Sequence, residues 1–188
     1  MATWHYLAGG AVLIGGALLL RSKVDSIAPS GLAVKAGGLT TSEEARLQQL
    51  VPSAQVALRR LQARLLELGI GTYVGSTART EAQQAANVSK GVSATNHSWH
   101  RLRRGVDLYP KLPNGQPDLQ GTQLEKFRTM HLEAEKFLWR GLAFNKDGSK
   151  RYITTNKGKV WDGGHLEFPE GMTWAQAEAA ARKGGQLA

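Results

Sequence analysis

Residues 98–110 read "SWHRLRRGVDLYP", and this stretch decides both the fold and the chemistry expected of the chain. Its last six residues, Gly105–Pro110, place apolar residues around one acid and end at a proline, which predicts a β-strand. Because successive side chains of a strand point to opposite faces, Asp107 should face away from its two apolar neighbours. We therefore expect a carboxylate on the face of the sheet that lies away from the core, seven residues after His100.

A second stretch, "WDGGHLEF" at residues 161–168, is organised in the same way. If His165 begins a strand, it and Glu167 face away from the apolar residues that follow each of them. Asp162 precedes His165 by three residues. Polar side chains from both strands are therefore expected to line a cleft on the face of the sheet opposite to its core.

His100, Asp107 and His165 make a candidate metal site. Imidazole nitrogen and carboxylate oxygen both bind zinc, and three protein ligands leave a fourth position for water, as in catalytic zinc sites. The chain has no cysteine, which excludes disulfides and thiolate metal sites. Hydrolysis also needs a base that takes the proton of the water and passes it to the leaving amine, and Asp162 is a candidate for that base.

The composition limits the class of protein. A chain of 188 residues, 41% hydrophobic and 21% charged, suits one folded domain with appendages. A net charge of +9 and a pI of about 10.0 favour polyanionic surroundings such as nucleic acid, anionic membrane or an acidic cell wall. No nucleic-acid module is recognisable, and aromatic residues are not interleaved with basic ones as in stacking platforms, so nucleic acid is not an expected partner.

The N-terminal residues 1–23 differ from the rest. Residues 4–20 ("WHYLAGGAVLIGGALLL") carry no Lys, Arg, Asp or Glu, and their length is near the lower limit for a bilayer-spanning helix, about 17 to 25 residues. An apolar helix is expected here, either as a membrane anchor or as a docking segment whose small residues pack against a partner protein. Residues 24–40 read as a linker, which leaves residues 41–188 as the folded domain.

The remaining pattern predicts an α+β fold in which helices flank a small antiparallel sheet. The expected helices cover residues 41–50, 52–68, 80–86, 122–141 and 173–182, and the expected strands cover 70–74, 105–110, 165–168 and a hairpin that turns at 156–158.

Capping boxes are expected at 41–44, 122–125 and 173–176, where a hydroxyl precedes an acid or amide by three residues. His131, on an apolar stripe that runs from Leu124 to Leu138, should be a core histidine. One face of the second helix is expected to carry Val56, Leu61, Leu65 and Leu68.

The two polar motifs resemble those of a known family of zinc peptidases, the D-alanyl-D-alanine carboxypeptidases and L-alanyl-D-glutamate endopeptidases. This family includes bacterial cell-wall peptidases, vancomycin-resistance dipeptidases and phage endolysins. Its first motif, Ser-x-His-x6-Asp, is matched by Ser98, His100 and Asp107. Its second motif, an acid followed after two residues by His, is matched by Asp162 and His165.

A third family feature is an arginine after a strand, followed by a helix that carries Gln. Arg79 in "VGSTARTEAQQ" matches it, and the three features occur in the family order over residues 42–168. The resemblance implies a fold like that of DD-peptidases and hedgehog-type domains. It also implies roles: one zinc ion held by His100, Asp107 and His165, a general base and acid at Asp162, electrostatic stabilisation of the scissile carbonyl by Arg79, and a supporting contact from Ser98.

The chain departs from the family pattern in the first motif. The family usually has glycine three residues after the first histidine and alanine five residues after it, where this chain has Arg103 and Gly105. Gly105 would still let the backbone pack closely. Arg103 leaves the conformation of the loop open and would bring charge to the rim of the cleft.

Residues beside the motifs have more than one interpretation. Glu167 is either a partner of a metal ligand or a plain strand residue, and Trp161 is either a packing residue or a wall of the substrate groove. The arginines of residues 101–104 are either a solvated run or a rim that binds the cell wall. His97 is expected to be a loop residue and not a ligand.

The resemblance implies a zinc metallopeptidase that cuts stem peptides or cross-links of bacterial peptidoglycan, with an endopeptidase favoured over a carboxypeptidase. Asp162 at a position that is often Glu resembles the phage-lysin branch. We therefore expect a membrane-tethered lysin or a virion-associated hydrolase that acts in the host periplasm or cell envelope and contacts membrane or virion through residues 4–20. The alternative is a non-catalytic, zinc-containing interaction module on the same fold.

Overall fold

The computed structural model describes residues 39–185 and residue 187. The expected anchor at residues 1–23 and its apolar helix lie outside the described residues, as does the linker except for its last two positions. Within the part of the chain that is described, no helix combines the length and the apolar character needed to cross a membrane.

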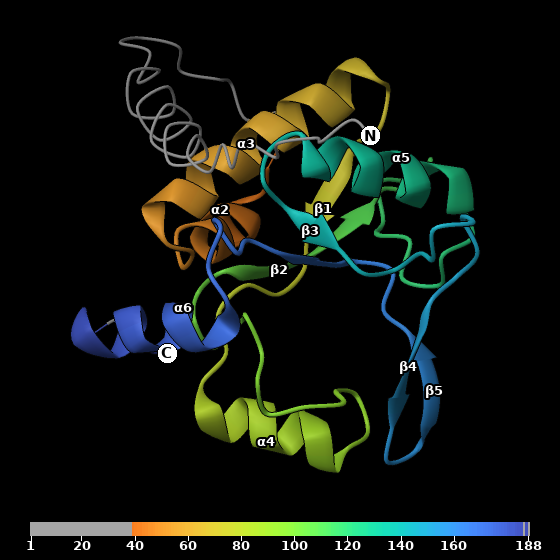
Figure 1. The fold of residues 1–188 in the computed structure, drawn as a ribbon. Coiled ribbons are helices and arrows are strands. Elements are labelled where there is room, and N and C mark those ends of the chain that lie inside the picture. Colours follow the sequence, from red (N-terminus) through yellow and green to blue (C-terminus); the bar gives the residue numbers. More distant parts are fainter. Residues whose placement is uncertain (1–38, 186, 188) are drawn as a thin grey trace, which may run out of the picture. The chain divides into compact units, whose positions relative to one another are not determined.

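The centre of the fold is a four-stranded antiparallel sheet (Figure 1). Its strands lie in the order β1 (Thr72–Val74), β2 (Gly105–Pro110), β6 (His165–Glu167) and β3 (Arg140–Gly141). In the β2–β6 pair, Asp107 lies opposite His165. The α+β class with a small antiparallel sheet is confirmed.

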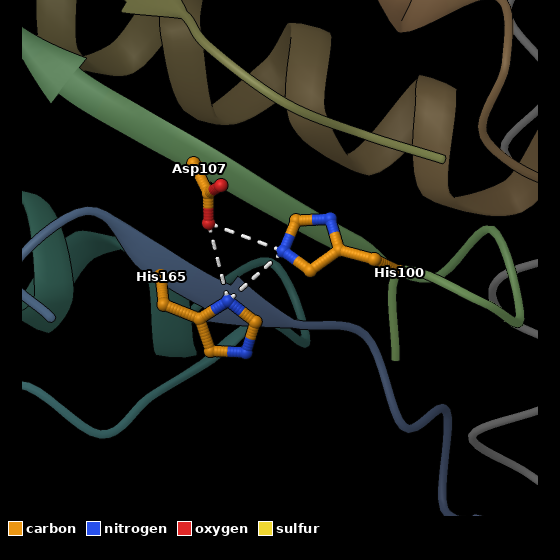
Figure 2. A group of neighbouring side chains, drawn as sticks. All are labelled: His100, Asp107 and His165. Carbon is orange, nitrogen blue, oxygen red and sulfur yellow. Dashed lines mark hydrogen bonds and ion pairs between the residues drawn. The ribbon is translucent and has the colours of Figure 1, made fainter. Parts of the chain in front are cut away.

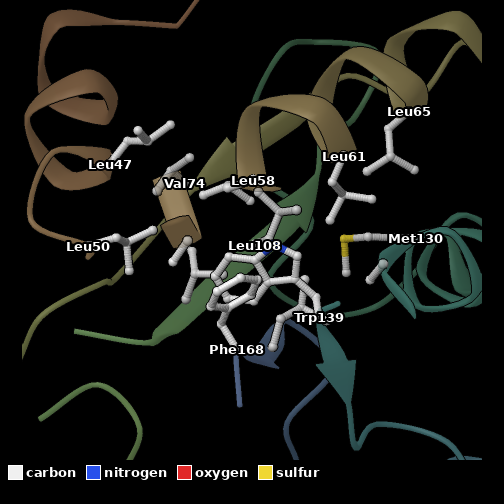
Figure 3. Close-up of a cluster of buried hydrophobic side chains, with 14 of the residues drawn as sticks. Leu47, Leu50, Leu58, Leu61, Leu65, Val74, Leu108, Met130, Trp139 and Phe168 are labelled. Carbon is white, nitrogen blue, oxygen red and sulfur yellow. The ribbon is translucent and has the colours of Figure 1, made fainter. Parts of the chain in front are cut away.

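The helices are α2 (Thr41–Leu47), α3 (Pro52–Glu67), α4 (Glu81–Ser89), α5 (Leu124–Glu135) and α6 (Trp174–Lys183). Helices α3 and α5 contact each other and the sheet, and the main core fills the space between them (Figure 3). Val106 and Leu108 of β2 and Leu166 of β6 are completely buried in this core. The predicted alternation is therefore correct, because the polar residues between these positions face the other side of the sheet.

Helix α3 covers the predicted residues, but the face that it buries is rotated from the predicted face. Val56 is 52% exposed and Leu68 is 40% exposed, so the prediction that these two share the core face was wrong. Ala54 and Leu58 occupy that face together with Leu61 and Leu65, all fully buried. These four residues follow one another at intervals of three or four, which is the spacing of one helical face.

Two of the three expected capping boxes differ in the structure. The box of α2 begins one residue earlier than expected, with Thr40 as the cap and Glu43 as its partner. At α5 the cap residue, Gln123, makes no capping hydrogen bond with its side chain, and the Asp118 carboxylate accepts from the backbone N–H groups of Thr122 and Gln123. The third box, formed by Thr173 and Gln176 at the start of α6, is confirmed.

Helix α5 ends at Glu135, six residues before the expected end near Gly141. Leu138 has a φ of 66° and is 53% exposed, so the apolar stripe stops before it. His131 is buried as predicted, and its Nε2 lies 2.8 Å from the Gly163 carbonyl oxygen. Burial lowers the pKa of His131 to about 4, so the neutral ring donates to that carbonyl and holds the loop that leads into β6.

The predicted hairpin forms a separate two-stranded sheet of β4 (Tyr152–Thr155) and β5 (Gly158–Trp161). Figure 1 shows that this hairpin and α4 project from the same side of the fold. Asn156 at the hairpin turn donates to the Ser89 carbonyl oxygen at the end of α4, at 3.5 Å. The hairpin and the segment after α4 therefore approach each other at their ends.

Candidate metal and catalytic site

His100, Asp107 and His165 converge on one point (Figure 2). The Nε2 atom of His100 lies 3.1 Å from Asp107 Oδ1 and 3.2 Å from His165 Nδ1, and that Nδ1 lies 3.3 Å from the same Oδ1. Asp107 and His165 come from paired strands, and His100 comes from the turn before β2. Two elements of the sheet and one turn thus bring together residues that lie far apart in the sequence.

The turn that carries His100 is held in place from two directions. The Ser98 hydroxyl accepts a hydrogen bond from the backbone N–H of His100 at 3.3 Å. A Cβ atom at Gly105 would lie only 2.7 Å from the backbone nitrogen of His100. Glycine is therefore required where the turn folds back against the start of β2, as its position in the motif suggested.

Arg103 stands in this turn where the family resemblance calls for glycine, and its φ is 56°. A side chain in this left-handed region costs about 1 kcal/mol or more. The backbone carbonyl of Arg103 accepts from Val51 N–H at 3.0 Å, and its guanidinium donates to the Gln49 carbonyl oxygen. These contacts with the α2–α3 connection offset the strain, so the turn adopts the glycine conformation with an arginine.

Both imidazole rings are oriented by partners behind them. His100 Nδ1 lies 2.7 Å from the Thr77 carbonyl oxygen, which can only accept, so Nδ1 carries the proton and a lone pair remains on Nε2. His165 Nε2 lies 3.5 Å from Glu167 Oε1, which favours the proton on Nε2 and a lone pair on Nδ1. Arg140 in turn donates to the Glu167 carboxylate. Such partners behind metal-binding imidazoles are typical of zinc sites.

The donor set fits a zinc ion. Three atoms that carry lone pairs face one another, an arrangement that repels itself unless a cation lies between them. A tetrahedral zinc site with bonds of about 2.0–2.2 Å has ligand atoms about 3.3–3.6 Å apart. The three separations here, 3.1, 3.2 and 3.3 Å, are close to that spacing.

Without a cation, the site attracts protons. Burial alone would raise the pKa of Asp107, but the imidazoles of His100 and His165 outweigh burial and hold it well below its usual value. Burial alone would lower the pKa of His165, but the carboxylates of Asp107 and Glu167 outweigh it and raise this pKa to about 10. The cluster is thus built to hold positive charge.

Arg79 and Asp162 both lie beside the cluster. Arg79 follows β1, and its Nη2 donates to Asp107 Oδ2 at 2.6 Å, while its Nε donates to Ser76 Oγ at 3.2 Å. Asp162 lines the same cleft as Asp107 and His165. Burial raises the pKa of Asp162 above its usual value, with the charge of Asp107 as a further cause.

A cleft of about 350 Å³ opens above these residues. One wall is the loop after α4, including Val92 and His97, and the opposite wall comes from the hairpin, including Ile153 and Trp161. His97 stacks on Trp174 with ring centroids 4.4 Å apart and is not part of the metal cluster, as predicted. Asp107, Asp162 and His165 lie at the base.

The structure decides between several interpretations left open by the sequence. Glu167 is a partner of His165. Trp161 lines the cleft and also packs edge-on against Phe127, with ring centroids 5.2 Å apart. Arg101 is neither solvated nor at the rim, because it is 7% exposed and donates to the Asn96 carbonyl oxygen. None of the arginines at residues 101–104 is among the residues that line the cleft.

Sequence reasoning missed two ionisable side chains that line the cleft, Tyr109 and Arg151. Burial raises the pKa of Tyr109, so its hydroxyl stays protonated. Strand alternation could have identified it, because Tyr109 lies two positions after Asp107 and shares its face. The Thr77 carbonyl that orients His100 had no signal, because any residue type supplies a carbonyl.

No protein-family model and no curated protein matches the chain. Among solved structures, the chain is similar to the L-Ala D-Glu endopeptidase ChiX of Serratia marcescens, with a TM-score of 0.49, 19% identity and coverage of 78% of this chain and 98% of that one. It is also similar to the LD-carboxypeptidase LdcB, with a TM-score of 0.47, 11% identity and coverage of 72% and 64%.

A third similar structure is the vancomycin resistance D,D-pentapeptidase VanY in complex with Zn(II). Here the TM-score is 0.45, the identity is 15%, and the match covers 72% of this chain and 79% of that one. In its motifs, the chain resembles the family of zinc D-Ala-D-Ala carboxypeptidases and L-Ala-D-Glu endopeptidases.

Proposed function

We propose that the chain is a zinc-dependent peptidase that hydrolyses peptide bonds in the stem peptides or cross-links of bacterial peptidoglycan. The observation that carries this proposal is the convergence of His100 Nε2, Asp107 Oδ1 and His165 Nδ1 at the base of a cleft. Asp107 and His165 themselves line the cleft, so an ion held by the three atoms faces a bound substrate.

A bound zinc ion supplies Lewis-acid chemistry, which polarises a peptide carbonyl and makes water acidic enough to attack near neutral pH. Asp162 is the group that takes the proton of the attacking water and delivers it to the leaving amine. Its position supports this role, since it lines the cleft and precedes a proposed ligand, His165, by three residues. The pKa of Asp162, raised by burial, makes its carboxylate a stronger base than an exposed aspartate.

Arg79 stabilises charge on the carbonyl oxygen during the attack. Its Nη2 is fixed by Asp107 and its Nε by Ser76, so the guanidinium is held in one orientation at the cleft. Among the described residues its Nη1 has no hydrogen-bond partner, and these N–H groups are available to a substrate oxygen. This pre-organised donor costs little reorganisation when charge develops.

The substrate class rests on the motif resemblance and on charge. Peptidoglycan stem peptides carry carboxylates, and a chain with a net charge of +9 is attracted to an acidic wall. An endopeptidase is favoured over a carboxypeptidase because Asp at position 162 resembles the phage-lysin branch. The setting as a phage lysin or virion-associated hydrolase, tethered through residues 4–20 in the host envelope, is a further proposal that fractionation of infected or expressing cells would test.

The test is digestion of purified peptidoglycan by zinc-loaded protein, with fragments identified by mass spectrometry. Wild type should release stem-peptide fragments, and Asp162→Ala should lower the rate about 100-fold or more while the protein keeps one zinc ion. Asp147→Ala, which removes an acid from an exposed loop, is the matched control and should leave the rate unchanged.

Two results would contradict the proposal. A wild-type protein that holds zinc but releases no fragment would favour the alternative, a non-catalytic zinc-containing module on the same fold. An Asp162→Ala variant that digests at the wild-type rate would remove Asp162 from the reaction.

A further inference from the structure

Among the residues that the structure describes, Arg151 is a cation at the cleft that has no acidic partner. The other arginine that lines the cleft, Arg79, is paired with Asp107. Glu167, which also lines it, is paired with Arg140. Within residues 39–185, Arg151 forms no ion pair, although it lies at the wall of a concave site where an unpaired guanidinium attracts an anion.

The position of Arg151 is set by its backbone. Its N–H donates to the Ala143 carbonyl oxygen at 2.8 Å, directly before β4 begins. The hairpin pairs Tyr152 with Trp161, so Arg151 and Asp162 are the residues that flank this last pair of the ladder, and both line the cleft. The backbone therefore places Arg151 at the end of the hairpin from which the chain leads to the proposed base.

The same face of the hairpin carries two aliphatic side chains. Ile153 lies two residues after Arg151, which places both on one face of the strand. Val160 lies directly opposite Ile153 in the hairpin register, and both side chains line the cleft. A ligand along this wall meets a guanidinium next to a small apolar surface.

These groups match one chemical class of ligand. Guanidinium binds carboxylate through two parallel hydrogen bonds, and this geometry favours carboxylate over a neutral amide. Ile153 and Val160 suit the methylene groups of a short stem that carries such a carboxylate. If the ligand carried a neutral amide instead of this carboxylate, Arg151 would have no negative charge to pair with.

We propose that Arg151, Ile153 and Val160 form a subsite for a carboxylate on a short aliphatic stem, which makes the protein selective for peptides with a free carboxylate near the scissile bond. The subsite rests on the proposed function, since it describes how that site selects its substrate. The carboxylate belongs either to a branching glutamyl residue or to the peptide C terminus, and the experiment below separates these two sources.

The experiment measures binding without turnover. The zinc-loaded full chain with Asp162→Ala is titrated by calorimetry with a stem pentapeptide that has free carboxylates, and with two analogues. One analogue is amidated at the α-carboxyl of the D-glutamyl residue, and the other at the C terminus. The same titrations are repeated with Arg151→Ala added, and with Lys159→Ala added as the matched control.

Lys159 suits this control because it lies on the same hairpin but on the other face. It pairs with Thr154, is exposed, and is not among the residues that line the cleft. Its removal takes away one positive charge from β5 and so reports any general effect of charge on binding.

We expect Arg151→Ala to weaken binding of the free pentapeptide about tenfold or more, and Lys159→Ala to weaken it less than about twofold. One of the two amidated analogues should bind the Asp162→Ala protein weakly. Its affinity should match that of the pentapeptide with free carboxylates for the protein that also carries Arg151→Ala. That analogue should lose nothing further when Arg151 is removed. Arg151→Lys should restore part of the affinity, because it keeps the charge but not the paired hydrogen bonds.

Three results would overturn the subsite. The free pentapeptide binds both Arg151→Ala and its parent equally, or Arg151→Ala weakens all three peptides by the same factor, or none of the peptides binds. A wild-type protein that digests no peptidoglycan would instead contradict the proposed function, because the binding measurements do not depend on cleavage.

Discussion

The four-stranded sheet and the β4–β5 hairpin contribute to the same cleft in different ways. In β2 and β6, the residues between the polar ones are buried in the core, so Asp107 and His165 are carried by a tightly packed element. In the hairpin, Thr155 is the one buried residue of the two strands. The groups proposed to hold a metal ion, which need exact distances, lie on the packed sheet. The groups proposed to recognise a substrate lie on an element that tolerates change.

The largest effect is expected from a change on the sheet side. His165→Ala removes one of three converging donors, so zinc content and peptidoglycan digestion should both fall to background. Metal analysis and fragment mass spectrometry measure the two losses together. The control is His97→Ala, which removes a histidine from the same cleft but outside the cluster, and this variant should keep its zinc.

Gly105→Ala tests the packing of the sheet against the turn. The new Cβ would lie 2.7 Å from the backbone nitrogen of His100, so the turn must shift. We expect unfolding free energy to fall by about 1–3 kcal/mol, measured by urea titration, together with weaker zinc binding. Gly71→Ala, whose Cβ would meet only Lys111 at 3.8 Å, should change stability much less. Equal losses in both variants would contradict the special role of Gly105.

Zinc affinity should depend on pH through His165. Without metal its pKa is raised to about 10, so at neutral pH the ring is protonated and zinc must displace that proton. Affinity should therefore rise with pH, by up to about tenfold per unit below that value. Calorimetry in buffers of different ionisation enthalpy should show about one proton released at pH 7, and no release would contradict the assignment.

The smallest effect is expected from the outer face of the hairpin. Tyr152 is 54% exposed, and Tyr152→Ala should change unfolding free energy by less than about 0.5 kcal/mol and leave zinc content unchanged. A thermal-shift measurement with metal analysis tests both expectations. A large loss of stability would mean that the hairpin is as tightly coupled to the fold as the sheet is.

The sequence predicted what depends on local pattern. The alternation around Asp107, and that of His165 and Glu167 with their apolar neighbours, placed these polar residues on the correct face of the correct strands. The sequence could not predict that His165 lies opposite Asp107, since strand register depends on how the whole chain packs. The Arg79–Asp107 contact likewise joins segments that only the folded sheet brings together.

The errors have physical causes as well. Thr122 does not cap α5 because its hydroxyl donates to the Asp118 carboxylate, which also accepts from the backbone N–H groups of Thr122 and Gln123. Val56 was assigned to the core face of α3 because it is apolar, but helical spacing from Ala54 and Leu58 turns it towards solvent. Residue type alone does not show which side of a helix faces the core.

The position of Asp107 opposite His165 has a consequence beyond catalysis. The two residues are 58 positions apart, and α5, β3 and the hairpin all lie in the segment between them. A metal ion that binds both residues closes this segment into a loop, as a disulfide would, in a chain that has no cysteine. The ion would then act as a reversible cross-link, and resistance of that segment to proteases would vary with the supply of zinc.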